Sequence, residues 1–153
     1  MQAYLKAKRT GYTILELAII ITISTLLATL SYTSFSSFSK NEALDAGTAS
    51  IVAGLRDARA RTLASVDGSQ YGIYIESNRY TLFKGSTYSA GSPFNTVTDL
   101  NSYILASTSL PAIVFERVTG DTTASGTIDV YLITDGSQKN TISIALTGLV
   151  DVE

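Results

Sequence analysis

Cysteine and histidine are both absent from the 153 residues of this chain. Without cysteine the protein forms no disulfide bond and has no thiolate nucleophile. Without histidine it lacks the side chain that most often acts as a general base. A metal site would need carboxylates alone, and Asp121, Asp129 and Asp135 are too scattered for a calcium loop. We interpret them as solvated loop acids and expect no catalytic residue, no metal and no cofactor.

Charge is scarce in the first part of the chain. Glu16 is the only charged residue between positions 10 and 39, and this stretch contains one glycine, Gly11, and no proline. As a helix, the 21 residues of Tyr12–Tyr32 would span about 30 Å, the thickness of a bilayer core. Ten are leucine or isoleucine. Each favours insertion by about 0.3–0.6 kcal/mol, whereas a central acid costs about 3 kcal/mol. We expect this segment to enter a membrane.

Three basic residues, Lys6, Lys8 and Arg9, stand directly before the apolar segment. Positive charges next to a membrane-spanning helix tend to stay in the cytoplasm. We therefore expect a single-pass protein of the cytoplasmic (inner) membrane, with everything after Tyr32 outside.

Glu16 admits two interpretations. It can be a carboxylate that reaches the membrane interface, or an intramembrane charge that needs a partner. A basic start and an apolar core also describe a secretory signal peptide. The length of the run, the early Glu16 and the lack of a clear Ala-x-Ala cleavage site count against that alternative.

Basic residues, then Gly11, then Tyr12-Thr13-Ile14-Leu15-Glu16-Leu17 and a long apolar run resemble the class III signal of type IV pilins and pseudopilins. The family pattern places a glutamate fifth after the cut, and Glu16 is fifth counting from Tyr12. The resemblance implies cleavage between Gly11 and Tyr12 by a prepilin peptidase. It also implies N-methylation of the new Tyr12 amine, which Glu16 of a neighbouring subunit would meet during filament assembly.

Such pairing has a physical basis, because an unpaired carboxylate in lipid is costly and a partner amine removes much of that cost. The resemblance further implies other pilin or pseudopilin subunits, membrane lipid and an inner-membrane assembly platform as partners. Thr10 stands where a basic residue often precedes the glycine, and the helix lacks the kink residues common in the family. Five hydroxyl residues can instead bond backbone carbonyls: Thr22, Ser24, Thr25, Thr29 and Ser31.

The charge balance argues against nucleic acid as a broad partner. Loss of Met1–Gly11 would remove three of the 11 basic residues and none of the 13 acidic ones, which leaves a net charge of −5. An acidic chain does not attract phosphate backbones. Three arginines, Arg56, Arg59 and Arg61, could touch DNA, but a solvated helix face is the favoured interpretation.

Four segments follow from the pattern: a leader at 1–11, an apolar helix at 12–39, an amphipathic helix at 40–66 and a β-rich domain at 67–153. The second helix carries an apolar stripe, which we expect to pack on the domain's own sheet. The stripe comprises Leu44, Ile51, Leu55, Ala58 and Leu63, flanked by Ala46, Val52 and Ala64. Asp67-Gly68 should end the helix, with Gly68 as a left-handed cap.

Five or six antiparallel strands are expected after the helix. A first hairpin joins Gln70–Ile75 to Tyr80–Lys84, and the residues at 85–98 read as a loop. The segment 99–109 can be a short helix or an edge strand. Further strands are expected at Ala112–Val118, Thr127–Thr134 and Thr141–Leu146, with a turn at Asp135-Gly136 and a short end at Leu149–Val152.

This layout predicts an α+β, pilin-like fold and resembles the GspH/FimT class of minor pseudopilins. The resemblance implies a non-enzymatic filament subunit of a type IV pilus or a type II secretion pseudopilus, acting near the tip or in initiation. It also implies an extracellular or periplasmic filament as the final location. A major pilin and a membrane-anchored binding module, such as an adhesin or a DNA-uptake receptor, remain alternatives. Filament entry should need Glu16, whereas simple anchoring should tolerate its loss.

Overall fold

The computed structural model describes residues 11–153, and between 30 and 37 only their helical backbone. The predicted leader residues Lys6, Lys8 and Arg9 lie outside this part. By its internal contacts the chain divides into two compact units, Met1–Phe38 and Ser39–Glu153. One helix, α1 (Ile14–Leu63), contributes to both units. All the β-strands found among residues 11–153 belong to the second unit.

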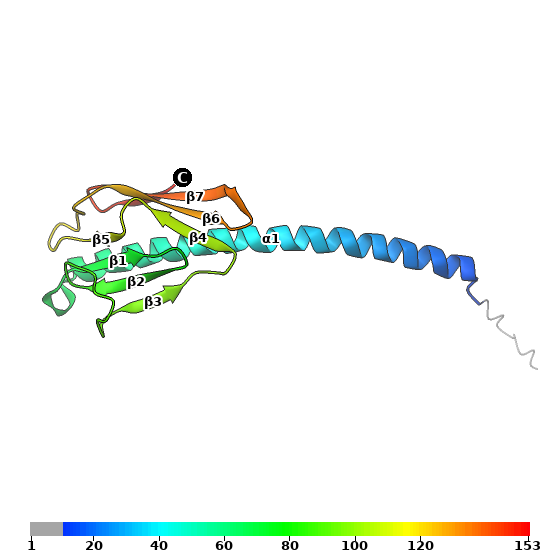
Figure 1. The fold of residues 1–153 in the computed structure, drawn as a ribbon, viewed down its shortest axis with the longest axis horizontal. Helices are drawn as coiled ribbons and strands as arrows, with labels where there is room; N and C mark the ends of the chain where they lie inside the picture. Colours follow the sequence, from blue (N-terminus) through cyan, green and yellow to red (C-terminus); the bar gives the residue numbers. More distant parts are fainter. Residues whose placement is uncertain (1–10) are drawn as a thin grey trace, which may run out of the picture. The chain divides into compact units, whose positions relative to one another are not determined.

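In the described part of the chain, eight strands follow the helix and form two antiparallel four-stranded sheets (Figure 1). Sheet A has the order β3–β2–β1–β5 and contains β1 (Tyr71–Ile75), β2 (Arg79–Lys84), β3 (Thr96–Asp99) and β5 (Ala112–Val114). Sheet B has the order β4–β6–β7–β8 and contains β4 (Ile104–Thr108), β6 (Gly126–Leu132), β7 (Asp135–Ile144) and β8 (Val150–Val152). The predicted α+β architecture is confirmed.

The second half of α1 buries one face against both sheets. Leu44, Ile51, Leu55 and Ala58 of the predicted stripe are buried in a single core, together with Ile73 of β1 and other strand residues. Side chains three or four positions apart share a helix face, which explains why these residues meet the sheets together. The expected packing of the stripe on the domain's own sheets is confirmed.

The predicted membership of the apolar stripe was wrong at its edges. Leu63, Ala64 and Ala46 are exposed, whereas Thr48 and Thr62 are buried. At about 100° per residue, Thr62 lies on the same line as Leu44, Leu55 and Ala58, while Leu63 is rotated a quarter turn away. Both threonines are tolerated because their hydroxyls donate to helix carbonyls, at 2.8 Å to Leu44 and 2.9 Å to Ala58.

The helix ends earlier than predicted. α1 stops at Leu63, and Ser65 takes a left-handed conformation with φ 50°. Gly68 is also left-handed, but it closes the 3₁₀ turn η1 (Val66–Gly68) rather than α1. The prediction that Gly68 caps α1 is therefore wrong. Ser65 takes the left-handed position after α1 that glycine usually occupies.

The first hairpin is confirmed, with Tyr71 paired to Lys84 and Ile75 to Tyr80. The segment 99–109 was expected to be either a short helix or an edge strand. It supplies β4, which is an edge strand of sheet B. Tyr71 and Tyr80, which belong to the two strands of this hairpin, are buried in the core.

Three strand predictions were wrong. β3 begins at the end of the segment 85–98, which was expected to be a loop. Its threonine and valine residues pair with β2 although their side chains are little buried. Asp135 and Gly136, which were predicted to form a turn, are the first residues of β7. The chain reverses two residues earlier, and the pairing of β6 with β7 is then interrupted by a bulge. Strand β5 ends at Val114, before the predicted Val118, where the chain enters a turn.

Candidate functional site

The start of α1 carries the residues that the sequence singled out. Gly11, Tyr12 and Thr13 are not helical, and the helix begins at Ile14. The amide of Glu16 donates to Thr13 Oγ1 at 3.2 Å, and the amide of Leu17 donates to the Thr13 carbonyl at 3.1 Å. Thr13 is therefore the N-cap residue, and Glu16 is the third residue of the first turn.

This cap places Glu16 close to the predicted cleavage point. Thr13-x-x-Glu16 has the spacing of a capping box, a signal that the interpretation of the motif overlooked. Among the described residues, the Glu16 carboxylate has no ion pair or side-chain hydrogen bond within the chain. The structure places Tyr12 at the same helix start, with its side chain exposed.

Large apolar side chains surround Glu16 along the helix. The exposed ones are Ile14, Leu15, Leu17, Ile19, Ile20, Ile21, Ile23, Leu26 and Leu27. Contiguous exposed apolar surface of this kind marks contact with a protein or a membrane.

Hydroxyl groups on this apolar helix bond to its own backbone. Thr22 donates to the Ala18 carbonyl at 2.7 Å, Thr25 to Thr22 at 2.9 Å and Thr29 to Leu26 at 2.8 Å. The expected bonding is confirmed for these three residues. Ser24 makes no such bond within the described chain, and the Ser31 side chain lies outside the described set. The three threonine hydroxyls therefore need no water or other partner.

Within the part of the chain that the structure describes, no helical stretch combines the length and the hydropathy that a membrane crossing requires.

The three arginines near the end of α1 do not form a free basic surface. Arg59 donates from Nε to the Gly120 carbonyl at 3.1 Å and from Nη2 to the Thr147 carbonyl at 3.2 Å. Arg61 pairs with Asp57 at 3.0 Å, and Arg56 is exposed without a partner in the described chain. The solvated-face interpretation is wrong for Arg59, which ties two loops to the helix.

Replacing Arg59 by alanine should lower the free energy of unfolding by about 1.5–3 kcal/mol, the range for hydrogen bonds made by charged groups. Two loop carbonyls would lose their donor at once. Urea unfolding of the full chain in mild detergent measures the effect. Arg56→Ala, on the same helix but without a partner, is the control and should change stability by less than about 0.5 kcal/mol. Equal effects of the two substitutions would contradict this role of Arg59.

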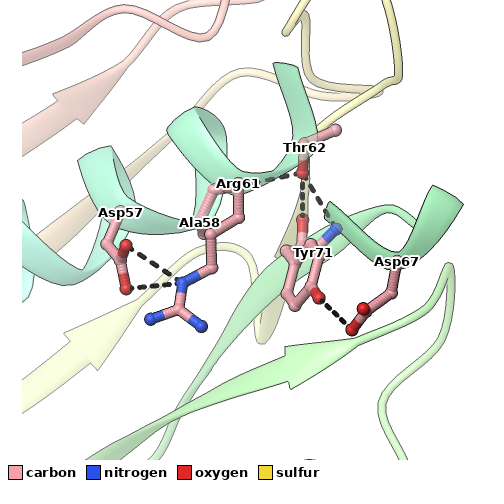
Figure 2. A network of polar contacts seen from close by, with 6 residues as sticks. All are labelled: Asp57, Ala58, Arg61, Thr62, Asp67 and Tyr71. Carbon is pink, nitrogen blue, oxygen red and sulfur yellow. Dashed lines mark hydrogen bonds and ion pairs between the residues drawn. The ribbon is translucent and has the colours of Figure 1, made fainter. Parts of the chain in front are cut away.

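Thr62 joins the helix end to the first strand (Figure 2). The Tyr71 amide donates to Thr62 Oγ1 at 2.9 Å, and at the other end of the same residue the Tyr71 hydroxyl donates to the Asp67 carboxylate at 3.2 Å. Lys84 also donates to Asp67, at 3.1 Å. The Lys84 hydrogen bond, followed by that of Tyr71, lowers the pKa of Asp67. These contacts fix the path from α1 into sheet A.

The three candidate acids are not brought together. Among residues 11–153, no group of three or more acidic side chains is placed to hold a metal ion. Asp129 is not a loop acid as interpreted: it lies on β6, accepts from the Thr141 hydroxyl at 2.7 Å and pairs with Lys139 at 3.0 Å. The Thr141 hydrogen bond, and after it the Lys139 bond, lowers the pKa of Asp129.

Stability should fall in acid, because folding favours the ionised forms of Asp67 and Asp129. A carboxylate whose pKa is lowered stabilises the fold above its unfolded pKa of about 3.9, and this contribution is lost as pH falls through the folded-state pKa. Asp129→Asn should therefore reduce the difference in unfolding free energy between neutral pH and about pH 3. Asp121→Asn, whose carboxylate has no partner in the described chain, should keep the parent's difference. An unchanged difference in Asp129→Asn would contradict the prediction.

Known structures share this architecture. Crystal structures of the type IV minor pilin FimU from Pseudomonas aeruginosa, in two crystal forms, resemble the chain with TM-scores of 0.59 and 0.62 at 14% identity. They cover 72% and 76% of this chain and 92% of the FimU chain. No protein-family model and no curated protein matches the sequence. At this identity the likeness establishes the fold, so the predicted pilin-like fold is confirmed.

Proposed function

We propose that the chain is a structural subunit of a type IV pilus or a type II secretion pseudopilus, assembled through its N-terminal helix. The observation that carries the proposal is that Glu16, which has no partner among the described residues, lies among exposed leucine and isoleucine side chains on α1 of a pilin-like fold. Within the described residues this surface has no cover. Lipid before assembly, and neighbouring subunits after it, would supply that cover and a partner for the charge.

The proposal includes processing at the helix start. Cleavage between Gly11 and Tyr12 by a prepilin peptidase would put the new amine four residues before Glu16 and one before the Thr13 cap. Gly11 and Tyr12 precede the helix and are exposed, and exposed backbone outside regular structure is where proteolysis concentrates. Methylation would then fall on the Tyr12 amine.

Likeness to a minor pilin favours a minor subunit that acts at the tip or in initiation, as the GspH/FimT resemblance also implies. In this proposal the chain enters the cytoplasmic membrane through the segment 12–39 with its globular domain outside, and then joins an extracellular or periplasmic filament. The assembly platform of the inner membrane would be a further partner.

The mass and first residue of the protein recovered from a sheared surface fraction test the proposal. A chain that begins at methylated Tyr12 is the expected result. An intact Met1 would identify a plain signal-anchored protein, and a start after Ser31 would identify an ordinary secreted domain; either result overturns the filament proposal.

A further inference from the structure

The loop between β2 and β3 covers part of the face of sheet A that points away from the core. In β1, Ile73 and Ile75 belong to the core, so Tyr74 between them lies on the opposite face, because successive strand residues alternate. Phe83 of β2 is outside the core as well, yet it is only 1% exposed. Tyr88 of the loop contributes to its cover, since the two rings meet edge-on with their centroids 5.5 Å apart.

Tyr88 also stacks on Tyr74. The ring centroids are 3.9 Å apart and the ring planes differ by 6°, so the two rings lie face to face. Both residues are half-buried, and part of each is therefore open to solvent. Among the residues whose side chains the structure describes, no other two tyrosine rings stack. The loop and β1 are thus joined through two phenol rings in van der Waals contact.

The loop has contacts of its own that keep Tyr88 in this position. The carbonyl of Ser89, the next residue, accepts from the Asn95 side-chain amide at 2.8 Å and from the Ser92 amide at 3.2 Å. At the start of the loop Gly85 has φ 118°, a conformation that glycine adopts without strain and that lets the chain leave β2 sharply. The stacked pair is therefore part of an ordered loop.

The composition of the chain directs one-electron oxidation to tyrosine. Cysteine, tryptophan and histidine are absent, and the single methionine is Met1. Oxidation of methionine gives a sulfoxide and no covalent link. A tyrosine that loses one electron and its hydroxyl proton becomes a phenoxyl radical, whose unpaired electron is shared with the ring carbons ortho to the oxygen. Two such radicals combine by forming a carbon–carbon bond.

We propose that Tyr74 and Tyr88 are a site of oxidative cross-linking, in which a carbon–carbon bond between the two rings fastens the β2–β3 loop to β1. This inference goes beyond the proposed filament function and does not depend on it. The unpaired electron of a phenoxyl radical occupies orbitals perpendicular to the ring plane. Rings that lie face to face therefore have these orbitals directed at one another, which is the arrangement that bond formation needs.

The reaction balances with hydrogen peroxide and a haem peroxidase as the oxidant. One peroxide takes one electron and one proton from each phenol and leaves as two water molecules. The new bond joins an ortho carbon of one ring to an ortho carbon of the other. The hydrogen on each of these carbons then moves as a proton to the neighbouring oxygen, which restores both phenols. The linked chain is therefore lighter than the parent by two hydrogens.

Peroxidase treatment of the full chain in mild detergent tests the proposal. A monomer lighter by two hydrogens is expected. Trypsin, which cuts after lysine and arginine, should release peptides 62–79 and 85–117 joined to each other, and fragmentation should place the link at Tyr74 and Tyr88. In urea the yield of this link should fall about tenfold, because the two rings then meet only by closure of a flexible loop.

Phenylalanine variants provide the matched controls. Tyr74→Phe and Tyr88→Phe keep the stacked ring but remove the hydroxyl, so each should abolish the link while the fold remains. Tyr103→Phe removes a 46% exposed tyrosine from the same tryptic peptide as Tyr88 and should leave the yield unchanged. A link at Tyr71 or Tyr103 instead, links between separate chains only, or an equal yield in urea would each overturn the proposal.

Urea unfolding of the linked chain provides a second readout. Positions 74 and 88 are 14 apart in the sequence. A covalent link between them restricts the unfolded chain, as a disulfide does in other proteins. The linked chain should therefore unfold at a higher urea concentration than unlinked chain from the same reaction. Equal midpoints would show that the bond does not fasten the loop to the folded domain.

Discussion

Replacing Gly148 by alanine should destabilise the globular domain by about 2–5 kcal/mol, the sum of a left-handed backbone penalty and an overpacking penalty. Gly148 has φ 69°, and its added Cβ would overlap the Gly120 carbonyl oxygen and lie 3.0 Å from Arg59 Nε. Both neighbours are held by the Arg59 hydrogen bonds, so neither can yield cheaply. Urea unfolding of the full chain in mild detergent measures the loss.

Gly136→Ala is the matched control. Its Cβ would meet nothing within 4 Å, and its φ is not in the left-handed region. Alanine there should leave stability unchanged or raise it by about 0.4–1 kcal/mol, because it restricts the unfolded chain. If Gly148→Ala were no more harmful than Gly136→Ala, the close approach of the two loops would not be a constraint on this fold.

Much of the fold could be predicted because its signals are local. The stripe around Leu44, Ile51 and Leu55 repeats at helical spacing, and the β1–β2 hairpin needs only two short strands and a connection. The misses occurred where tertiary contacts outweighed local preference. Thr62 is buried because its position on the helix, not its polarity, decided its environment. β3 forms because β2 offers it a free edge.

The candidate site shows the same division. Thr13 and Glu16 are three residues apart, so their capping relation can be predicted from sequence. Arg59 is different, since its acceptors lie 61 and 88 residues later in the chain. No periodicity or motif connects residues so far apart. The helix end and the two loops come together only in the folded protein, and their close approach is what constrains Gly148.

Replacing Glu16 by alanine should abolish entry into filaments while the chain still reaches the membrane. Loss of the charge makes the apolar segment easier to insert, by about 3 kcal/mol at most on the insertion scale. Assembly would lose the group that, in the proposed function, meets the Tyr12 amine of a neighbour. The ratio of chain in the sheared fraction to chain in the membrane fraction measures the effect. Glu42→Ala, an exposed acid of the same helix in the second unit, is the control and should leave the ratio unchanged.

Replacing Glu16 by glutamine distinguishes two roles that Glu16 could have, as a helix-capping residue and as a charged partner for the amine of a neighbouring subunit. A glutamine side chain at this position could complete a capping box with Thr13 as well as glutamate could, because its oxygen can also accept a hydrogen bond at the helix start. As a partner for a charged amine it fails, because the negative charge is gone. We therefore expect Glu16→Gln to behave like Glu16→Ala in the filament fraction. Normal assembly of the glutamine variant would show that Glu16 acts as a helix cap and that intersubunit charge pairing is not what recruits the chain.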